Sequence, residues 1–124
     1  MKKILIMIAL TLLSVSASAN ELYRAPGAGD KGAYYIIESK IQENGMIRVL
    51  CSRIGKGRAY TDFTEVMINC NSEQYLTLAG SYENGAKDKP SKPLKTYSKK
   101  SKWASLIRDS SKYELVKYVC KKFK

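Results

Sequence analysis

The chain has 124 residues with no histidine, and its 22 basic side chains outnumber the 11 acidic ones. This length fits one domain with a modest core. The absence of histidine excludes Ser-His and Cys-His catalytic pairs. Because the acidic residues are also scattered rather than paired, we expect a protein that is not an enzyme and that needs neither a cofactor nor a metal.

Residues 1–19 are predicted to be a secretory signal peptide. Lys2 and Lys3 give a basic start, Ile4–Leu13 is an apolar run, and Ala17-Ser18-Ala19 is a small-residue cleavage site. No later stretch is long and apolar enough to cross a bilayer, and no cysteine near the cleavage site could carry a lipid. We therefore expect an exported domain of residues 20–124 in the periplasm, on the cell surface or outside the cell.

The positive charge is concentrated in the last third of the chain. Residues 20–86 carry seven basic and eight acidic side chains, whereas residues 87–124 carry thirteen basic and three acidic ones, a net of +10. This asymmetry favours an anionic partner for the C-terminal third, although a basic surface also keeps a small protein soluble. In an exported protein, glycosaminoglycans, acidic host proteins and lipopolysaccharide phosphates are candidates, and nucleic acid is a less expected one.

Residues 20–84 predict an antiparallel meander. Asn44-Gly45 is the strongest turn signal in the chain, and Thr61–Tyr82 is predicted to be a hairpin on which Val66, Ile68 and Cys70 share the apolar side. Turns recur at intervals of about 10 to 14 residues, which favours hairpins between neighbouring strands. The predicted strands are Glu21–Arg24, Gly32–Glu38 and Met46–Ile54, followed by the two strands of Thr61–Tyr82, which are separated by a turn at Asn71, Ser72 and Glu73.

Gly85–Lys102 has a different composition from the segments before it. It contains seven lysines, two prolines and few apolar residues, which predicts a mobile loop. A short strand is expected around Leu94–Tyr97. Trp103–Ile107 restores apolar character and is expected to dock on the sheet.

A C-terminal helix completes the predicted fold, which is an α+β domain of about six antiparallel strands with one helix on one face. Ser111 and Glu114 have capping-box spacing. Lys117, Lys121 and Lys122 lie toward the end of the helix, where its dipole favours cations. An apolar stripe follows helical periodicity through Leu115, Val116, Val119, Cys120 and Phe123.

Three cysteines in an oxidising compartment predict one disulfide and one free thiol. Cys70 and Cys120 both point to apolar surfaces, which modestly favours their pairing. Cys51 shares a face with Ile47 and Val49, so its pairing with either of the other cysteines stays open. A bond between Cys70 and Cys120 would close a loop of about 50 residues and stabilise the fold by about 4 kcal/mol.

Two residue types leave a choice between a packing role and a chemical one. If Cys51 is the free thiol, burial would make it inert, whereas Arg48 or Arg53 nearby could activate it. The nine tyrosines could stack on bases or sugars, but tyrosine on a sheet more often packs across strands.

The order of these features resembles the surface-adhesin protein E family of Gram-negative bacteria, over most of residues 33–120. The matching pieces are Tyr34-Tyr35-Ile36 with Ser39 and Ile41, Asn44-Gly45 before Ile47-Arg48-Val49, Tyr60, Ile68-Asn69-Cys70, Tyr75–Tyr82, Trp103 with Asp109-Ser110, and Leu115 with Val119-Cys120. The resemblance implies about six antiparallel strands and a C-terminal helix, held together by a Cys70–Cys120 disulfide. It also implies binding of host matrix and serum proteins such as vitronectin and laminin, although the best-known member has a lipid anchor that this chain lacks.

Two hypotheses of function follow. The first is an exported adhesin-like binding protein that holds host matrix or serum proteins, or a glycosaminoglycan, through the lysine cluster. The alternative is a periplasmic accessory or structural protein with no host ligand, in which these lysines are only a solvated loop. The cluster consists of Lys92, Lys95, Lys99, Lys100 and Lys102.

Overall fold

The computed structural model describes residues 20–27, 29–97 and 102–123. It contains a seven-stranded antiparallel sheet with the strand order β1-β2-β3-β4-β5-β6, in which β7 pairs with a different part of β5. The predicted signal peptide, Lys99 and Lys100 lie outside the described residues. The strands are β1 (Glu21–Arg24), β2 (Ala33–Ile41), β3 (Ile47–Ile54), β4 (Tyr60–Asn69), β5 (Gln74–Asn84), β6 (Lys95–Thr96) and β7 (Ala104–Ser105), followed by the helix α2 (Ser111–Lys122).

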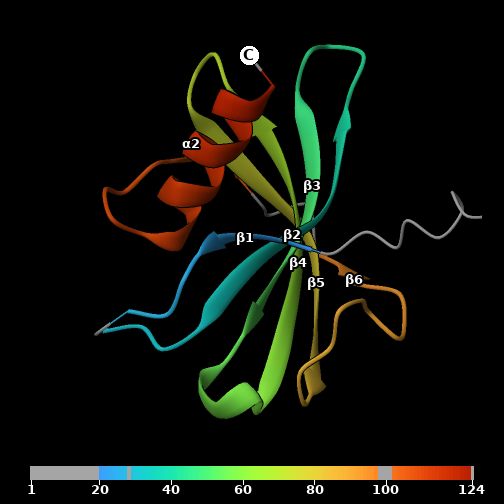
Figure 1. The fold of residues 1–124 in the computed structure, drawn as a ribbon. Coiled ribbons are helices and arrows are strands. Elements are labelled where there is room, and N and C mark those ends of the chain that lie inside the picture. Colours follow the sequence, from blue (N-terminus) through green and yellow to red (C-terminus); the bar gives the residue numbers. More distant parts are fainter. Residues whose placement is uncertain (1–19, 28, 98–101, 124) are drawn as a thin grey trace, which may run out of the picture.

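This architecture confirms the predicted meander, the C-terminal helix and the α+β class. Figure 1 shows α2 packed against one side of the sheet, where it contacts β1 and β5. A short 3-10 turn, Lys56–Arg58, connects β3 to β4. Within the described residues, no helix has the length and hydropathy that crossing a bilayer requires.

Alternation along the central strands divides the sheet into two faces. Val49 pairs with Val66 and Ile47 with Ile68, and all four side chains are buried beneath α2. We call this side the helix face. Neighbouring side chains on a strand point to opposite faces. Phe63 pairs with Ser52 and lies an odd number of positions from Val66 on β4. Its side chain therefore lies on the other side of the sheet, which we call the loop face.

The helix docks through Leu115, Val116 and Val119, each of which is fully buried. Its cap differs by one residue from the prediction. Ser110, in extended conformation, caps the helix by accepting a hydrogen bond from the Tyr113 backbone N–H, and Ser111 is the first helical residue. Sequence spacing suggested Ser111 because the two serines are adjacent and only one of them is followed by glutamate three residues later.

The Cys70–Cys120 disulfide is present, with a Cα–Cα distance of 5.6 Å and a sequence separation of 50. The sequence predicts Cys70 within the strand, but β4 ends at Asn69 and Cys70 lies in the turn that follows. Asn69 ends the strand because its side-chain oxygen accepts hydrogen bonds from the backbone N–H groups of Asn71 and Ser72. The bond therefore ties the turn after β4 to the last turn of α2.

Opposite the helix, a second buried region surrounds Phe63, which is 1% exposed. The chain that leaves β5 folds back against this region (Figure 1), and the buried Thr61 hydroxyl donates to the Gly85 carbonyl and accepts from the Lys87 N–H. Ser91 donates to the buried Glu83 carboxylate through its backbone N–H and its hydroxyl. Residues 85–91 are thus bonded to the sheet, a role that the lysine-rich composition did not predict.

The docking expected for Trp103–Ile107 is confirmed in part. Ala104 and Ser105 pair with Tyr75 and Gln74 as strand β7, and Leu106 packs on the core. The side chains of Trp103 and Ile107, in contrast, are 38% and 73% exposed.

Candidate functional site

The described part of the lysine segment (Gly85–Lys102) runs along the outer edge of β5. Within it, the short strand β6 confirms the strand expected near Leu94–Tyr97, and it places Lys95 opposite Gly80. Lys102 comes two residues before Ala104, which lies opposite Tyr75. Because β7 runs antiparallel to β5, Lys102 lies from Ala104 toward Gly80. Lys95 and Lys102 therefore lie near the same edge of β5 but belong to different segments of the chain.

Three of the five predicted site residues fall in the described part of the segment. Lys92, Lys95 and Lys102 are all exposed, and none of them has a carboxylate within ion-pair distance among the residues that the structure describes. Lys87, in the same segment, is different because its ammonium lies 3.7 Å from the buried Glu83 carboxylate.

Two lysines of α2 form ion pairs with residues outside the helix. Lys117 forms an ion pair with Glu73 at 2.7 Å, and Lys122 forms one with Glu21 at 2.6 Å. The hydrogen bond to Glu73 raises the pKa of Lys117. The excess charge of the C-terminal third is thus partly neutralised on the helix, and it stays available on the lysine segment.

Glu83 links the lysine segment to the sheet and has a lowered pKa. The hydrogen bonds from Ser91 are the largest cause, and the charges of Lys87 and Lys92 add to their effect. Sequence reasoning missed this residue. No local pattern marks it, because its role depends on the register in which Glu83 pairs with Thr61 and both side chains are buried.

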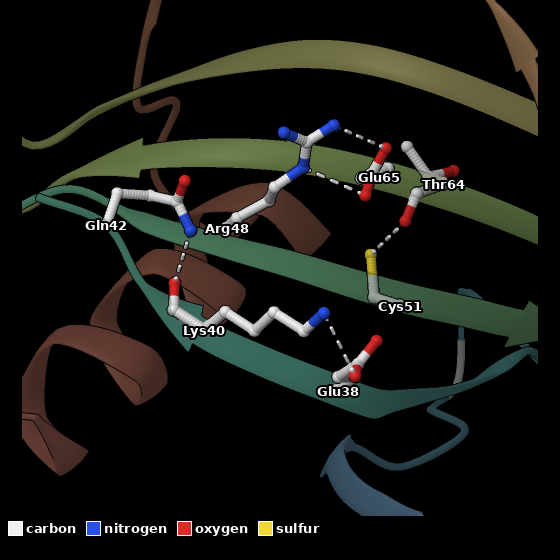
Figure 2. Close-up of polar contacts among 7 residues, drawn as sticks. All are labelled: Glu38, Lys40, Gln42, Arg48, Cys51, Thr64 and Glu65. Atoms are coloured by element: carbon white, nitrogen blue, oxygen red, sulfur yellow. Dashed lines mark hydrogen bonds and ion pairs between the residues drawn. The ribbon is translucent and has the colours of Figure 1, made fainter.

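A second charged surface lies on the loop face, across β2, β3 and β4. Figure 2 shows Arg48 aimed at Glu65, with two hydrogen bonds of 3.0 and 3.2 Å, and Lys40 next to Glu38 at 3.6 Å. These side chains line a hollow of about 340 Å³. Because each cation here has an acidic neighbour, this surface carries little net attraction for an anion.

The free thiol of Cys51 is buried and donates to the Thr64 carbonyl at 3.4 Å, as Figure 2 shows. Burial raises its pKa to about 11. Arg48 points to the opposite face toward Glu65, and Arg53 binds Asp30 at 3.1 Å, so neither arginine activates the thiol. The inert alternative therefore fits the geometry better than the reactive one.

The polar cluster of Asp30, Tyr34 and Arg53 was not anticipated from the sequence. Tyr34 donates to Asp30 at 2.6 Å, and this bond, with others from the Gly32 N–H and Arg53, strongly lowers the pKa of Asp30. The guanidinium of Arg53 also lies 5.6 Å from the ring centroids of Tyr34 and Tyr60. These contacts connect the start of β2 to the end of β3 and the start of β4.

No set of three His, Cys, Asp or Glu side chains that could hold a metal ion occurs among residues 20–27, 29–97 and 102–123. Comparison with known proteins identifies no relative, since no family model, curated protein or solved structure matches this chain.

Proposed function

We propose that this chain is an exported binding protein of the surface-adhesin protein E type, and that it holds an extended anionic partner along its lysine segment. A glycosaminoglycan, or an acidic stretch of a host matrix or serum protein, has the required chemistry. The observation that carries the proposal is that Lys92, Lys95 and Lys102 are exposed and have no ion pair among the described residues, with Lys95 on the strand that pairs with β5.

The placement of these lysines favours a polymer over a small anion. A small anion is held by groups that converge on it, whereas Lys95 belongs to β6 and Lys102 precedes β7, two strands that pair with separate stretches of β5. A polyanion can contact such groups in sequence. Surface lysines of this kind give fast association that weakens as salt rises.

The sheet, the C-terminal helix and the Cys70–Cys120 bond of the structure agree with what the family resemblance implies, and this agreement supports the family proposal. Lys99 and Lys100 are predicted to belong to the same site. The proposal includes export through a cleaved signal peptide.

Heparin affinity chromatography tests the proposal with matched charge changes. The triple variant Lys92, Lys95 and Lys102→Glu is expected to elute at a much lower salt concentration than the unmodified protein. The control replaces three exposed cations elsewhere, Lys31, Lys56 and Arg58, with glutamate, and it should elute close to the unmodified protein. Equal losses in both variants would mean that only net charge matters, and the site would be rejected.

The Lys99 and Lys100→Glu variant extends this test to the rest of the predicted cluster. Its binding to heparin and to vitronectin should fall relative to the unmodified protein. Unchanged binding to both would remove these two lysines from the site.

A periplasmic accessory role remains the second candidate because part of the lysine segment serves the fold. The bonds of Ser91 to Glu83 and of Lys87 to Thr61 give residues 85–91 a structural purpose. Cell fractionation separates the two functions. The binding proposal predicts antibody labelling of intact cells or recovery from the medium, whereas exclusive recovery from the periplasm favours the accessory role.

A further inference from the structure

A hollow of about 420 Å³ lies where α2 no longer covers the sheet, among β4, β5 and the residue after β6. A smaller hollow of about 160 Å³ adjoins it beneath the start of α2, and both share Asp62 and Thr64. We call the larger one the tyrosine groove. Its main lining residues are Asp62, Thr64, Gly80, Ser81, Tyr82 and Tyr97.

Two exposed aromatic side chains flank the tyrosine groove. Tyr82 is 55% exposed and Tyr97 is 47% exposed. Tyr97 lies over Gly80, where a side chain would collide with its hydroxyl group. Glycine at this position therefore keeps the wall of the groove in place.

The ring of Tyr82 is supported from below. It stacks on Tyr60 with a centroid distance of 5.3 Å. Tyr60 accepts a hydrogen bond from Arg53 and lies against Gly55, where there is no room for a Cβ. An exposed ring held by such supports is ordered before any ligand arrives, which reduces the entropic cost of binding.

The floor of the groove offers hydrogen-bonding groups without partners. Arg53 is the cross-strand neighbour of Asp62, but its guanidinium is turned toward Asp30 and Tyr60. Within the described residues, the Asp62 carboxylate therefore has no ion pair or hydrogen bond. The Thr64 hydroxyl likewise has none, because the bond from Cys51 goes to the Thr64 carbonyl.

The surrounding charges restrict the class of ligand. Asp62 disfavours an anion inside the groove. Lys112 lines the adjoining hollow and Lys95 lies opposite Gly80 on β6, so these two charges offset the attraction of Asp62 for a cation. What remains is a neutral molecule with hydroxyl donors for the carboxylate and C–H faces for the tyrosine rings. We propose that the tyrosine groove binds a neutral oligosaccharide, whose pyranose rings stack on Tyr82 and Tyr97 while its hydroxyls donate to Asp62.

This binding differs in chemistry from the proposed polyanion binding, and it uses Tyr97 of the lysine segment but none of the segment's lysines. A neutral sugar contacts the groove without counterion release, so its affinity is nearly independent of salt. The groove therefore stands or fails independently of the proposed binding of polyanions.

Isothermal titration calorimetry with maltotriose, cellotriose and triacetylchitotriose tests the inference on the disulfide-bonded protein. At least one of these neutral trisaccharides should bind. The Tyr82→Ala and Tyr97→Ala variants should each weaken that binding by about tenfold or more, and Asp62→Asn should weaken it as well. Far-UV circular dichroism of each variant should match the unmodified protein, since all three side chains are at least partly exposed.

Two controls sharpen the result. Leu22→Ala, at an exposed position on β1, and the Lys92 and Lys102→Glu variant should each change the affinity for sugar less than about twofold. Raising the salt to about 0.5 M should have an equally small effect. The inference is overturned if none of the three sugars binds at millimolar concentration, or if binding survives both tyrosine substitutions.

Discussion

The two buried regions of this sheet are closed by different means. On the helix face, α2 contributes Leu115, Val116 and Val119 to an apolar cluster, and a disulfide ties its last turn to the turn after β4. On the loop face, a charged segment is attached to the sheet through the side chains of Thr61 and Glu83. One region depends mainly on burial and a covalent bond, and the other depends on hydrogen bonds.

The difference shows how a highly charged segment can belong to an ordered fold. Buried polar groups are costly unless they are paired, and Thr61 and Glu83 find their partners in the backbone and in Ser91. Once these bonds anchor residues 85–91, Lys95 follows on β6 at the edge of β5, and Lys92, Lys95 and Lys102 are exposed to water. The loop face thereby positions the surface to which we assign function.

The largest effect is expected on the helix face. Replacing both Cys70 and Cys120 with alanine should lower the free energy of unfolding by about 4 kcal/mol, because the bond closes a loop of 50 residues. Urea denaturation followed by circular dichroism measures the change. A loss below about 1 kcal/mol would show that apolar burial alone holds the helix.

A smaller effect is expected on the loop face from Thr61→Val. Valine keeps the shape but leaves the Gly85 carbonyl and the Lys87 N–H without their partner, so the free energy of unfolding should fall by about 1 to 3 kcal/mol. Thr96→Val, at an exposed position on β6, is the matched control and should change stability by less than about 0.5 kcal/mol. Equal values for the two variants would contradict the anchoring role of Thr61.

The two regions should also differ in their response to acid. The pKa of Glu83 is lower in the folded protein than its ordinary value, so its contribution to stability is complete above that ordinary pKa and is lost as the pH falls through the folded value. The stability difference between the unmodified protein and Glu83→Gln should therefore shrink as the pH falls below about 4. Because Asp30 titrates in both proteins, its effect cancels. A difference that stays constant from neutral pH to pH 3 would rule out this carboxylate as the anchor.

The smallest effect concerns how tightly the helix face is closed. Cys51 lies beside the hollow under the start of α2, but it is buried and its pKa is about 11. Ellman's reagent at pH 8 should leave the native protein unmodified and should label one thiol after unfolding in urea. Rapid labelling of the native protein would mean that this end of the helix opens readily.

Much of the fold could be predicted because its signals are local. Alternating residues marked the strands, Asn44-Gly45 marked a turn, and the stripe of Leu115, Val116 and Val119 marked the buried face of the helix. The direction of two side chains only modestly favoured the Cys70–Cys120 pairing over one with Cys51, and the family resemblance implied it.

The candidate sites depend on contacts that local patterns do not contain. Lys92, Lys95 and Lys102 were chosen by charge, but the placement of Lys95 and Lys102 follows from the pairing of β6 and β7 with β5. The partners of Thr61 lie 24 and 26 residues farther along the chain, and a composition rich in lysine masked these contacts. The tyrosine groove likewise depends on Tyr97 lying over Gly80.

Hydrogen exchange of the Lys87 and Ser91 amides tests most directly whether the lysine segment is an ordered part of the fold. At neutral pH, both amides should exchange far more slowly than in an unstructured peptide, because each donates to a side chain of the sheet, at 2.9 and 2.8 Å. Glu83→Gln should speed the exchange of Ser91 more than that of Lys87. Exchange of both amides at the unstructured rate in the unmodified protein would contradict the account.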